Sequence, residues 1–146
     1  MKMLSALLCL LIFAIYGCGS GSSSTEKRNL DIDETSFKQT PSGLQYLIVK
    51  EGTGDRPAPG DEVTINYTGL LMDGTVFQES DEESLIFKLG SGNVLKGIDE
   101  GVQLISPGGR IRLIIPPALA YGERGAGKVP PNSTIVFDIE LLKVEL

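Results

Sequence analysis

The sequence holds two cysteines and no histidine among its 146 residues, which restricts the chemistry that its side chains can perform. Without histidine, Ser-His-Asp and Cys-His nucleophilic sites are excluded, together with the commonest metal ligand. Both cysteines, Cys9 and Cys18, lie at the start of the chain, so the remainder has no disulfide framework and no zinc spacing. We therefore expect no metal and no cofactor, and a site built from aromatic, apolar, hydroxyl and amide groups.

Glycine-rich and acidic segments offer weaker candidates. Residues 89–93 and 121–128 match neither phosphate-binding glycine pattern, and neither joins a strand to a long helix. A glycosidase with two carboxylates remains an alternative, although Asp73, Asp99 and Glu123 stand beside glycine or other acids, as solvent-exposed residues do. Residues 41–146 contain nine Lys and Arg against fifteen Asp and Glu, a net charge of −6. Such an acidic domain is not expected to bind nucleic acid.

The aromatic residues are the remaining candidates. In "YTGLLMDGTVFQES", residues 67–80, the Asp73-Gly74 turn signal predicts a hairpin that carries Tyr67 and Phe77 on paired strands. A neutral amide, Gln78, follows at once. Six aromatic residues lie in or beside predicted strands: Tyr46, Tyr67, Phe77, Phe87, Tyr121 and Phe137. Each taken alone is most simply a core residue, except that Tyr121, in a loop of glycine and proline, is better placed at the rim of a cleft.

The elements that must position these residues are mainly strands. Alternation and β-branched composition predict five of them, over residues 44–50, 62–69, 84–90, 111–116 and 133–146. The apolar positions change parity at Leu141-Leu142, which predicts a bulge or a change of sheet partner. Val94, Ile98, Val102 and Ile105 recur at helical spacing and predict one short helix. The class is therefore α+β.

The N-terminal region reads as an export signal followed by a tether. The apolar run from Met3 to Ile15 is too short to span a bilayer, which takes about 20 residues, and suits a secretory signal. Cys18 after a small residue resembles a bacterial lipobox, so we predict a signal peptide over 1–17 and a lipid anchor at Cys18; a plain secretory signal is the alternative. Residues 18–40 are Gly/Ser-rich and charged, which predicts a flexible polar linker, and residues 41–146 form one domain.

Several segments together resemble the FKBP-type peptidyl-prolyl cis–trans isomerases, most closely the bacterial exported members. They occur in the family's order and cover nearly all of 41–146: VTINYTGLLMDGTVF (63–77), GIDEGV (97–102), LIIPPALAYG (113–122) and VPPNSTIVFDIELLKVE (129–145). The resemblance implies a twisted, mostly antiparallel five-stranded sheet wrapped around one short helix. It also implies an isomerase that assists the folding of exported proteins, in the periplasm or on an extracellular membrane surface.

The resemblance implies a pocket for a proline ring. Its catalytic residues would be Tyr67, Phe77, Gln78, Tyr121 and Phe137. Its substrate-binding residues would be Phe87, Val94, Leu95, Ile98 and Val129. Their partners would be proline-containing polypeptides of the cell envelope, with the membrane reached through the lipid anchor alone.

Two departures from the family pattern bear on activity. Ile98 stands where many members have Trp, which implies a shallower floor and weaker binding of the family's macrolide inhibitors. Gln78 replaces an Asp, and its amide keeps a hydrogen-bonding oxygen but has no charge. We therefore expect reduced isomerase activity. Two alternatives stay open: a tethered chaperone that binds prolyl segments with little turnover, and a purely structural envelope lipoprotein.

Overall fold

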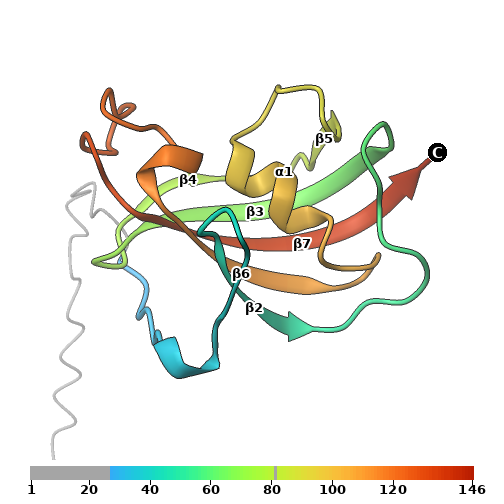
Figure 1. Ribbon diagram of the computed structural model, residues 1–146, viewed down its shortest axis with the longest axis horizontal. Helices are drawn as coiled ribbons and strands as arrows, with labels where there is room; N and C mark the ends of the chain where they lie inside the picture. The colour runs from blue at the N-terminus through green and yellow to red at the C-terminus, as the bar shows by residue number, and fades with distance from the viewer. Residues whose placement is uncertain (1–26, 81) are drawn as a thin grey trace, which may run out of the picture.

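The computed structural model describes residues 27–80 and 82–146. The predicted signal peptide and Cys18 lie outside the described residues. Within them, one antiparallel sheet forms the body of the molecule, and its strands are β1 (Lys38–Gln39), β2 (Gln45–Lys50), β3 (Glu62–Leu71), β4 (Val76–Glu79), β5 (Leu85–Lys88), β6 (Arg110–Ile115) and β7 (Ile135–Glu145). Their order is β1-β2-β6-β7-β3-β4, with β5 also pairing with β3. The helix α1 (Lys96–Val102) lies across one face of this sheet (Figure 1).

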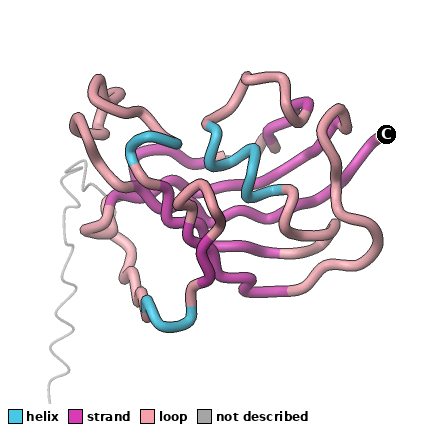
Figure 2. The backbone as a smooth tube through the Cα atoms, in the orientation of Figure 1, coloured by secondary structure: helices cyan, strands magenta, loops and turns pink. Residues whose placement is uncertain are grey.

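The predicted α+β class is confirmed, whereas the predicted number of strands is wrong. The sheet has seven strands, and five of them overlap the predicted ranges. The additional strands are β1, which is only two residues long, and β4, the return strand that the hairpin signal placed at Phe77 but that was not among the five counted ranges. Both are too short to show an alternating pattern in sequence. Two 3₁₀ turns, η1 (Glu34–Ser36) and η2 (Pro117–Leu119), complete the elements seen in Figure 2.

The inner face of the sheet, which lies against α1, carries the main core. Val63 and Ile65 of β3 are fully buried there with Val102 of α1. Gly97 and Gly101 lower the intrinsic helix propensity of this segment, but they let α1 approach β6. A Cβ added at Gly97 would lie 2.5 Å from the Ile115 side chain, and one added at Gly101 would lie 2.3 Å from that of Leu113. The short helix is therefore held by packing rather than by its own propensity.

The predicted irregularity of the last strand is a β-bulge. Ile65 of β3 pairs with Leu141 and Thr64 with Lys143, so Leu142 is the additional residue of β7. Leu142 is exposed while Leu141 is buried. The change of parity in the sequence thus marks the position where β7 gains one residue against β3.

Residues 27–40, which we call the strap, lie on the outer face of the sheet, opposite α1. We expected this segment to belong to the flexible linker; its described part instead packs on the domain (Figure 1). Three partly buried apolar residues of the strap, Leu30, Ile32 and Phe37, cover the buried outer-face residues Leu70, Ile114 and Val136. Their spacing follows neither a helical nor a strand period, so the sequence showed only a polar segment with scattered apolar residues. Among the described residues, no helix has the length and apolar character needed to span a membrane.

Candidate active site

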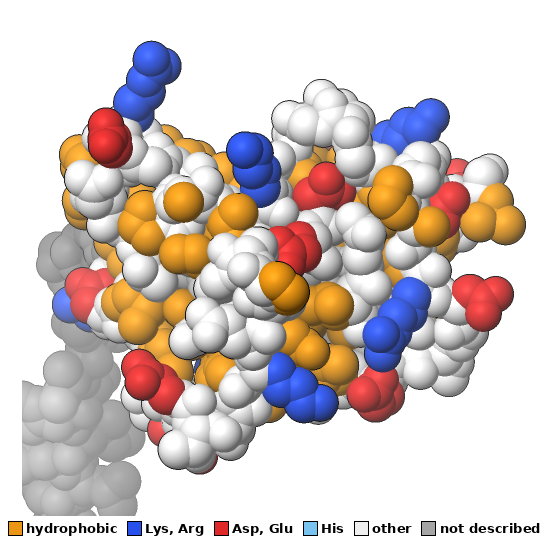
Figure 3. All heavy atoms as spheres, viewed as in Figure 1, with side chains coloured by type: hydrophobic (Ala, Val, Ile, Leu, Met, Phe, Trp, Pro, Cys, Tyr) orange, Lys and Arg blue, Asp and Glu red, His pale blue; other side chains and the backbone are white. Residues whose placement is uncertain are grey.

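Four aromatic rings meet on the inner face near one end of α1. Phe137 of β7 lies at their centre and is 1% exposed. Its ring centroid is 5.8 Å from that of Tyr67 and 5.7 Å from that of Phe77, and Phe77 is 6.3 Å from Tyr121. The two contacts of Phe77 are edge-to-face, an arrangement that the quadrupoles of aromatic rings favour. Apolar side chains gather on the side of the molecule where β4 and η2 lie (Figure 3).

A bulge in β4 allows two consecutive residues to serve this site. Gly69 of β3 pairs with Gln78, and Leu70 pairs with Val76, so Phe77 is the additional residue. In a regular strand Phe77 and Gln78 would face opposite sides. With the bulge, the ring of Phe77 reaches Phe137 while Gln78 reaches Tyr67, both on the inner face. Both residues were predicted for the site from the sequence, but the bulge was not.

Gly69 makes room for the rings and was missed by sequence reasoning. An added Cβ at this position would lie 2.8 Å from Cζ of Phe77 and 3.1 Å from Cε1 of Phe137. Glycine inside a strand often marks such a close approach, and its place two residues after Tyr67 is the signal that could have found it.

Gln78 forms a direct hydrogen bond to Tyr67. Its Nε2 donates to Oη of Tyr67 over 2.9 Å, across the β3–β4 ladder. Gln78 is exposed and Tyr67 is partly buried, so this polar pair lies at the solvent edge of the ring cluster. An Asp at position 78 could not donate in this way, because a carboxylate only accepts.

The second tyrosine of the cluster lies in the loop after η2. Burial, and then the proximity of Tyr67, raise the pKa of the Tyr121 hydroxyl above its ordinary value. The hydroxyl therefore stays protonated at neutral pH and remains available as a hydrogen-bond donor. The predicted rim position agrees with its partial burial.

The five predicted substrate-binding residues belong to the main apolar core of the inner face, which also includes the four rings. Phe87, Ile98 and Val129 are 5%, 5% and 3% exposed, and Val94 and Leu95 pack against the cluster as partly buried residues. Leu95 is the N-cap of α1, and its carbonyl accepts the amide hydrogens of Ile98 and Asp99. All ten predicted site residues thus contribute to one apolar cluster or, in the case of Gln78, bond to it.

Two open hollows include Tyr67 in their lining. One, of about 410 Å³, lies on the outer face and includes Thr68, Arg112 and Asp138 in its lining. The other, of about 910 Å³, lies between β4 and β5 and includes Leu85 and three acidic residues. The rings themselves pack against one another and form an apolar surface. In the described part of the chain, no three His, Cys, Asp or Glu side chains gather closely enough to hold a metal ion.

Comparison with known proteins identifies the family. Residues 54–142 match the family model of the FKBP-type peptidyl-prolyl cis-trans isomerases. The chain belongs to this family. It is 44% identical over 122 residues to the FKBP-type peptidyl-prolyl cis-trans isomerase FkpA of Escherichia coli strain K12, covering 82% of this chain. It is 49% identical over 107 residues to the peptidyl-prolyl cis-trans isomerase Fkbp12 of Drosophila melanogaster, covering 70% of this chain and 99% of that protein.

Solved structures of the family share the fold. The crystal structure of FkpA from Escherichia coli superposes with a TM-score of 0.71 at 45% identity, covering 77% of this FKBP-type chain and 53% of that chain. The structure of AtFKBP13 superposes with a TM-score of 0.68 at 38% identity, covering 73% of this chain and 97% of that one. The chain spans 44% of the length of the FkpA sequence that it matches.

Proposed function

We propose that this chain is a peptidyl-prolyl cis–trans isomerase that binds proline-containing segments against the aromatic cluster. The observation that carries the proposal is the convergence of Tyr67, Phe77, Tyr121 and Phe137 on one apolar surface, in which both tyrosines are partly buried. Such a surface suits a proline ring flanked by peptide carbonyls. Membership of the FKBP-type family supports the same reaction.

The reaction requires no nucleophile and no metal. Rotation about an X-Pro amide passes through a twisted state, with a barrier of roughly 18–20 kcal/mol, and no covalent bond is broken. The chain lowers this barrier by binding the twisted amide more tightly than either planar form. The twisted carbonyl has less charge separation than a planar amide, so an uncharged, apolar surface favours it. The Tyr121 hydroxyl and the Leu95 amide would donate hydrogen bonds to substrate carbonyls and so orient the chain.

Gln78 is the residue that sets the level of activity in this proposal. A carboxylate at position 78 would accept a hydrogen bond from Tyr67, whereas the Gln78 amide donates one to it. The proton of the Tyr67 hydroxyl is then directed elsewhere, and the site has no charge beside the twisting carbonyl. We therefore expect measurable but reduced turnover.

The test compares wild type with the Gln78→Asp variant in two assays. One follows isomerisation of a short prolyl peptide, and the other follows refolding of a protein limited by proline isomerisation, which takes about 10–100 s unassisted. We expect acceleration by both proteins and a larger acceleration by the variant. Acceleration by the variant alone would contradict the isomerase proposal for the natural chain.

The second candidate, a binding module with little turnover, is favoured by the same Gln78–Tyr67 bond. A parallel titration with the prolyl peptide separates the two functions. Binding by wild type without acceleration would support the module, and absence of both would support a structural lipoprotein. For the macrolide inhibitors, we expect tighter binding by the Ile98→Trp variant, since many members of the family carry Trp at this position.

The location belongs to the same proposal. We expect export and attachment to a membrane through a lipid on Cys18, with envelope proteins as substrates. The apolar run, Gly17 and Cys18 support this expectation. Mass spectrometry of the mature protein tests it: a diacyl modification on Cys18, lost together with membrane attachment in Cys18→Ser, is expected. A mature chain without a lipid would indicate a plain secretory signal.

A further inference from the structure

The strand β4 carries two residues of the candidate site but has little to hold it in place. It is four residues long, lies at the edge of the sheet after β3, and contains the bulge at Phe77. Edge strands with an interrupted ladder open more easily than central strands. Because Phe77 and Gln78 depend on this bulge for their direction, contacts that fix β4 from outside the ladder bear on the site.

The strap makes contacts at both ends of β4 through one residue. At the start of the strand, the Arg28 amide donates to the Gly74 carbonyl over 2.9 Å, and Lys27 forms a β-bridge with Thr75. At the end of the strand, Nη2 of Arg28 donates to Oε1 of Glu79 over 2.9 Å. Arg28 therefore spans β4 from the turn to its last residue.

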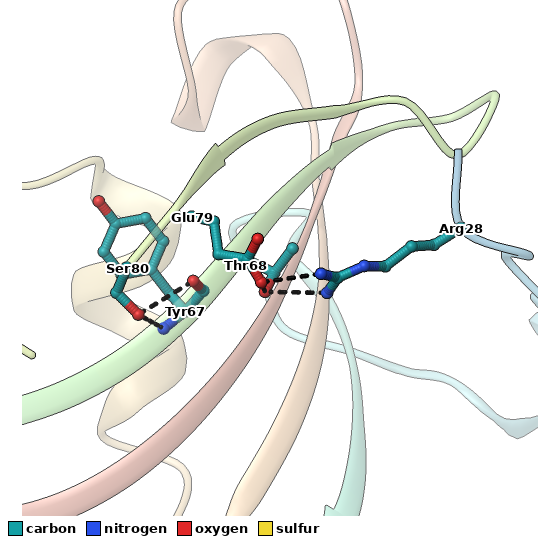
Figure 4. A network of polar contacts seen from close by, with 5 residues as sticks. All are labelled: Arg28, Tyr67, Thr68, Glu79 and Ser80. Carbon is teal, nitrogen blue, oxygen red and sulfur yellow. Dashed lines mark hydrogen bonds and ion pairs between the residues drawn. The ribbon is translucent and has the colours of Figure 1, made fainter. Parts of the chain in front are cut away.

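The guanidinium of Arg28 joins β4 to β3 as well. Nη1 donates to Oγ1 of Thr68 over 3.4 Å, and Thr68 in turn donates to the same Glu79 oxygen over 3.1 Å (Figure 4). Thr68 and Glu79 are partners in the ladder. Their side chains, 41% exposed for Arg28 and 37% for Glu79, form a partly screened, charge-assisted cluster.

This cluster adjoins the Gln78–Tyr67 bond in both strands. Thr68 follows Tyr67 in β3, and Glu79 follows Gln78 in β4. The next position after the ladder is also fixed, because the Ser80 hydroxyl accepts the Tyr67 amide hydrogen over 2.8 Å and donates to the Tyr67 carbonyl over 3.2 Å (Figure 4). A shift of Glu79 would therefore change the direction of Gln78 while Tyr67 stays in place.

We infer that Arg28 is a positioning residue of the site: by bridging Glu79 and Thr68 it holds the bulged strand so that Phe77 and Gln78 face Tyr67. The inference rests on the proposed isomerase function for its effect on turnover, but its structural part does not. The strap is thus a component of the site's geometry as well as a connection toward the N-terminus.

The experiment uses the full chain with Arg28→Ala, Arg28→Lys and the charge-matched control Lys27→Ala. Lys27 pairs with Asp73 at the turn and loses the same charge without touching Glu79. NMR follows the side-chain amide of Gln78, whose resonances report the bond to Tyr67. The same samples give kcat and KM on a prolyl peptide, and thermal unfolding gives Tm.

We expect Arg28→Ala to shift the Gln78 amide resonances toward those of a solvated amide and to lower kcat/KM about three- to tenfold, less than the roughly 10²-fold cost of a 1 Å misplacement. Arg28→Lys should show smaller changes in both quantities, since lysine keeps the positive charge but lacks the paired donors of the guanidinium. Lys27→Ala should change neither. In a Glu79→Ala background, Arg28→Ala should have a smaller additional effect, because only the bond to Thr68 among those described here is then left to lose.

Unchanged Gln78 resonances in Arg28→Ala would overturn the inference, as would equal effects from Lys27→Ala, which would indicate a general contribution of strap charge. Shifted resonances with unchanged kcat/KM would also overturn it. If wild type shows no turnover at all, the proposed function fails, and the NMR comparison together with peptide affinity still decides whether Arg28 positions the site.

Discussion

The two faces of the same sheet differ in chemistry although they share the same strands. On the inner face, Gly69 pairs with Phe137 in the aromatic cluster; one residue away on the outer face, Thr68 pairs with Asp138. Arg112 forms two hydrogen bonds to Asp138 there, of 2.6 and 2.8 Å. Because strand residues alternate between faces, the chain separates the apolar surface that we propose for binding from an ion-paired surface without using separate elements. The inner face is expected to determine recognition, and the outer face stability, apart from the Arg28 cluster that holds β4.

The largest effect should come from comparing the neighbours Phe137 and Val136. Phe137→Leu and Val136→Ala each remove buried volume and should each cost roughly 1–3 kcal/mol of unfolding free energy. Only Phe137 contacts the rings of Tyr67 and Phe77, so we expect at least a tenfold fall in kcat/KM for Phe137→Leu and a change within twofold for Val136→Ala. Urea unfolding and peptide kinetics on both variants give the answer. Equal losses of activity would show that the two faces are not separable.

The next effect concerns how α1 is held on the inner face. Alanine favours a helix over glycine by about 1 kcal/mol, yet a Cβ at Gly101 would lie 2.3 Å from Leu113. Overpacking of this kind costs about 1–3 kcal/mol, so Gly101→Ala should lower the stability despite the better propensity. Thermal and urea unfolding measure the sign. A stabilised variant would mean that the helix can move away from β6 at little cost.

A smaller effect is expected on the outer face. Asp138→Asn leaves Arg112 without its carboxylate partner, and because both side chains are partly exposed the cost should be about 0.5–1 kcal/mol. Isomerase activity should not change. The difference in stability from wild type should shrink in 1 M salt, which screens exposed charges. An unchanged difference would mean that the pair acts through packing instead of charge.

Much of the site could be predicted from the sequence, and the rest depends on ladder register. The hairpin pattern placed Tyr67 and Phe77 together. The family resemblance added Phe137, which lies 60 residues after Phe77. The bulge at Phe77 could not be predicted, because it exists only in the pairing of β4 with β3. The packing of the strap depends on the rest of the fold in the same way: the partly buried Leu30 packs against the outer face of a sheet formed later in the chain.

The smallest expected change is in the pH dependence of kcat/KM. The pKa of the Tyr121 hydroxyl is raised by burial and by Tyr67, so it stays protonated until the pH exceeds the ordinary tyrosine value of 10.0. No histidine is present to titrate near neutrality. We therefore expect kcat/KM to stay constant from about pH 6 to 9. A bell-shaped profile centred near pH 7 would contradict an uncharged site.

The pH dependence of the stability should differ from that of kcat/KM, because exposed carboxylates outside the site titrate in acid. Hydrogen bonds from Thr35 and Thr75 lower the pKa values of Asp33 and Asp73, respectively, below the ordinary 3.8. A lowered folded-state pKa contributes stability that is present above the ordinary value and is lost as the pH falls through the folded one. Tm should thus decline below about pH 4.

For Tyr121 the sign is opposite: its contribution to the stability is complete below pH 10.0 and is lost above it. The Gln78→Asp variant should add an acidic limb to kcat/KM, since it places a titrating carboxyl beside Tyr67. Acid would then lower the Tm of the wild type through carboxylates outside the site, whereas in the variant it would also lower kcat/KM through the carboxyl beside Tyr67.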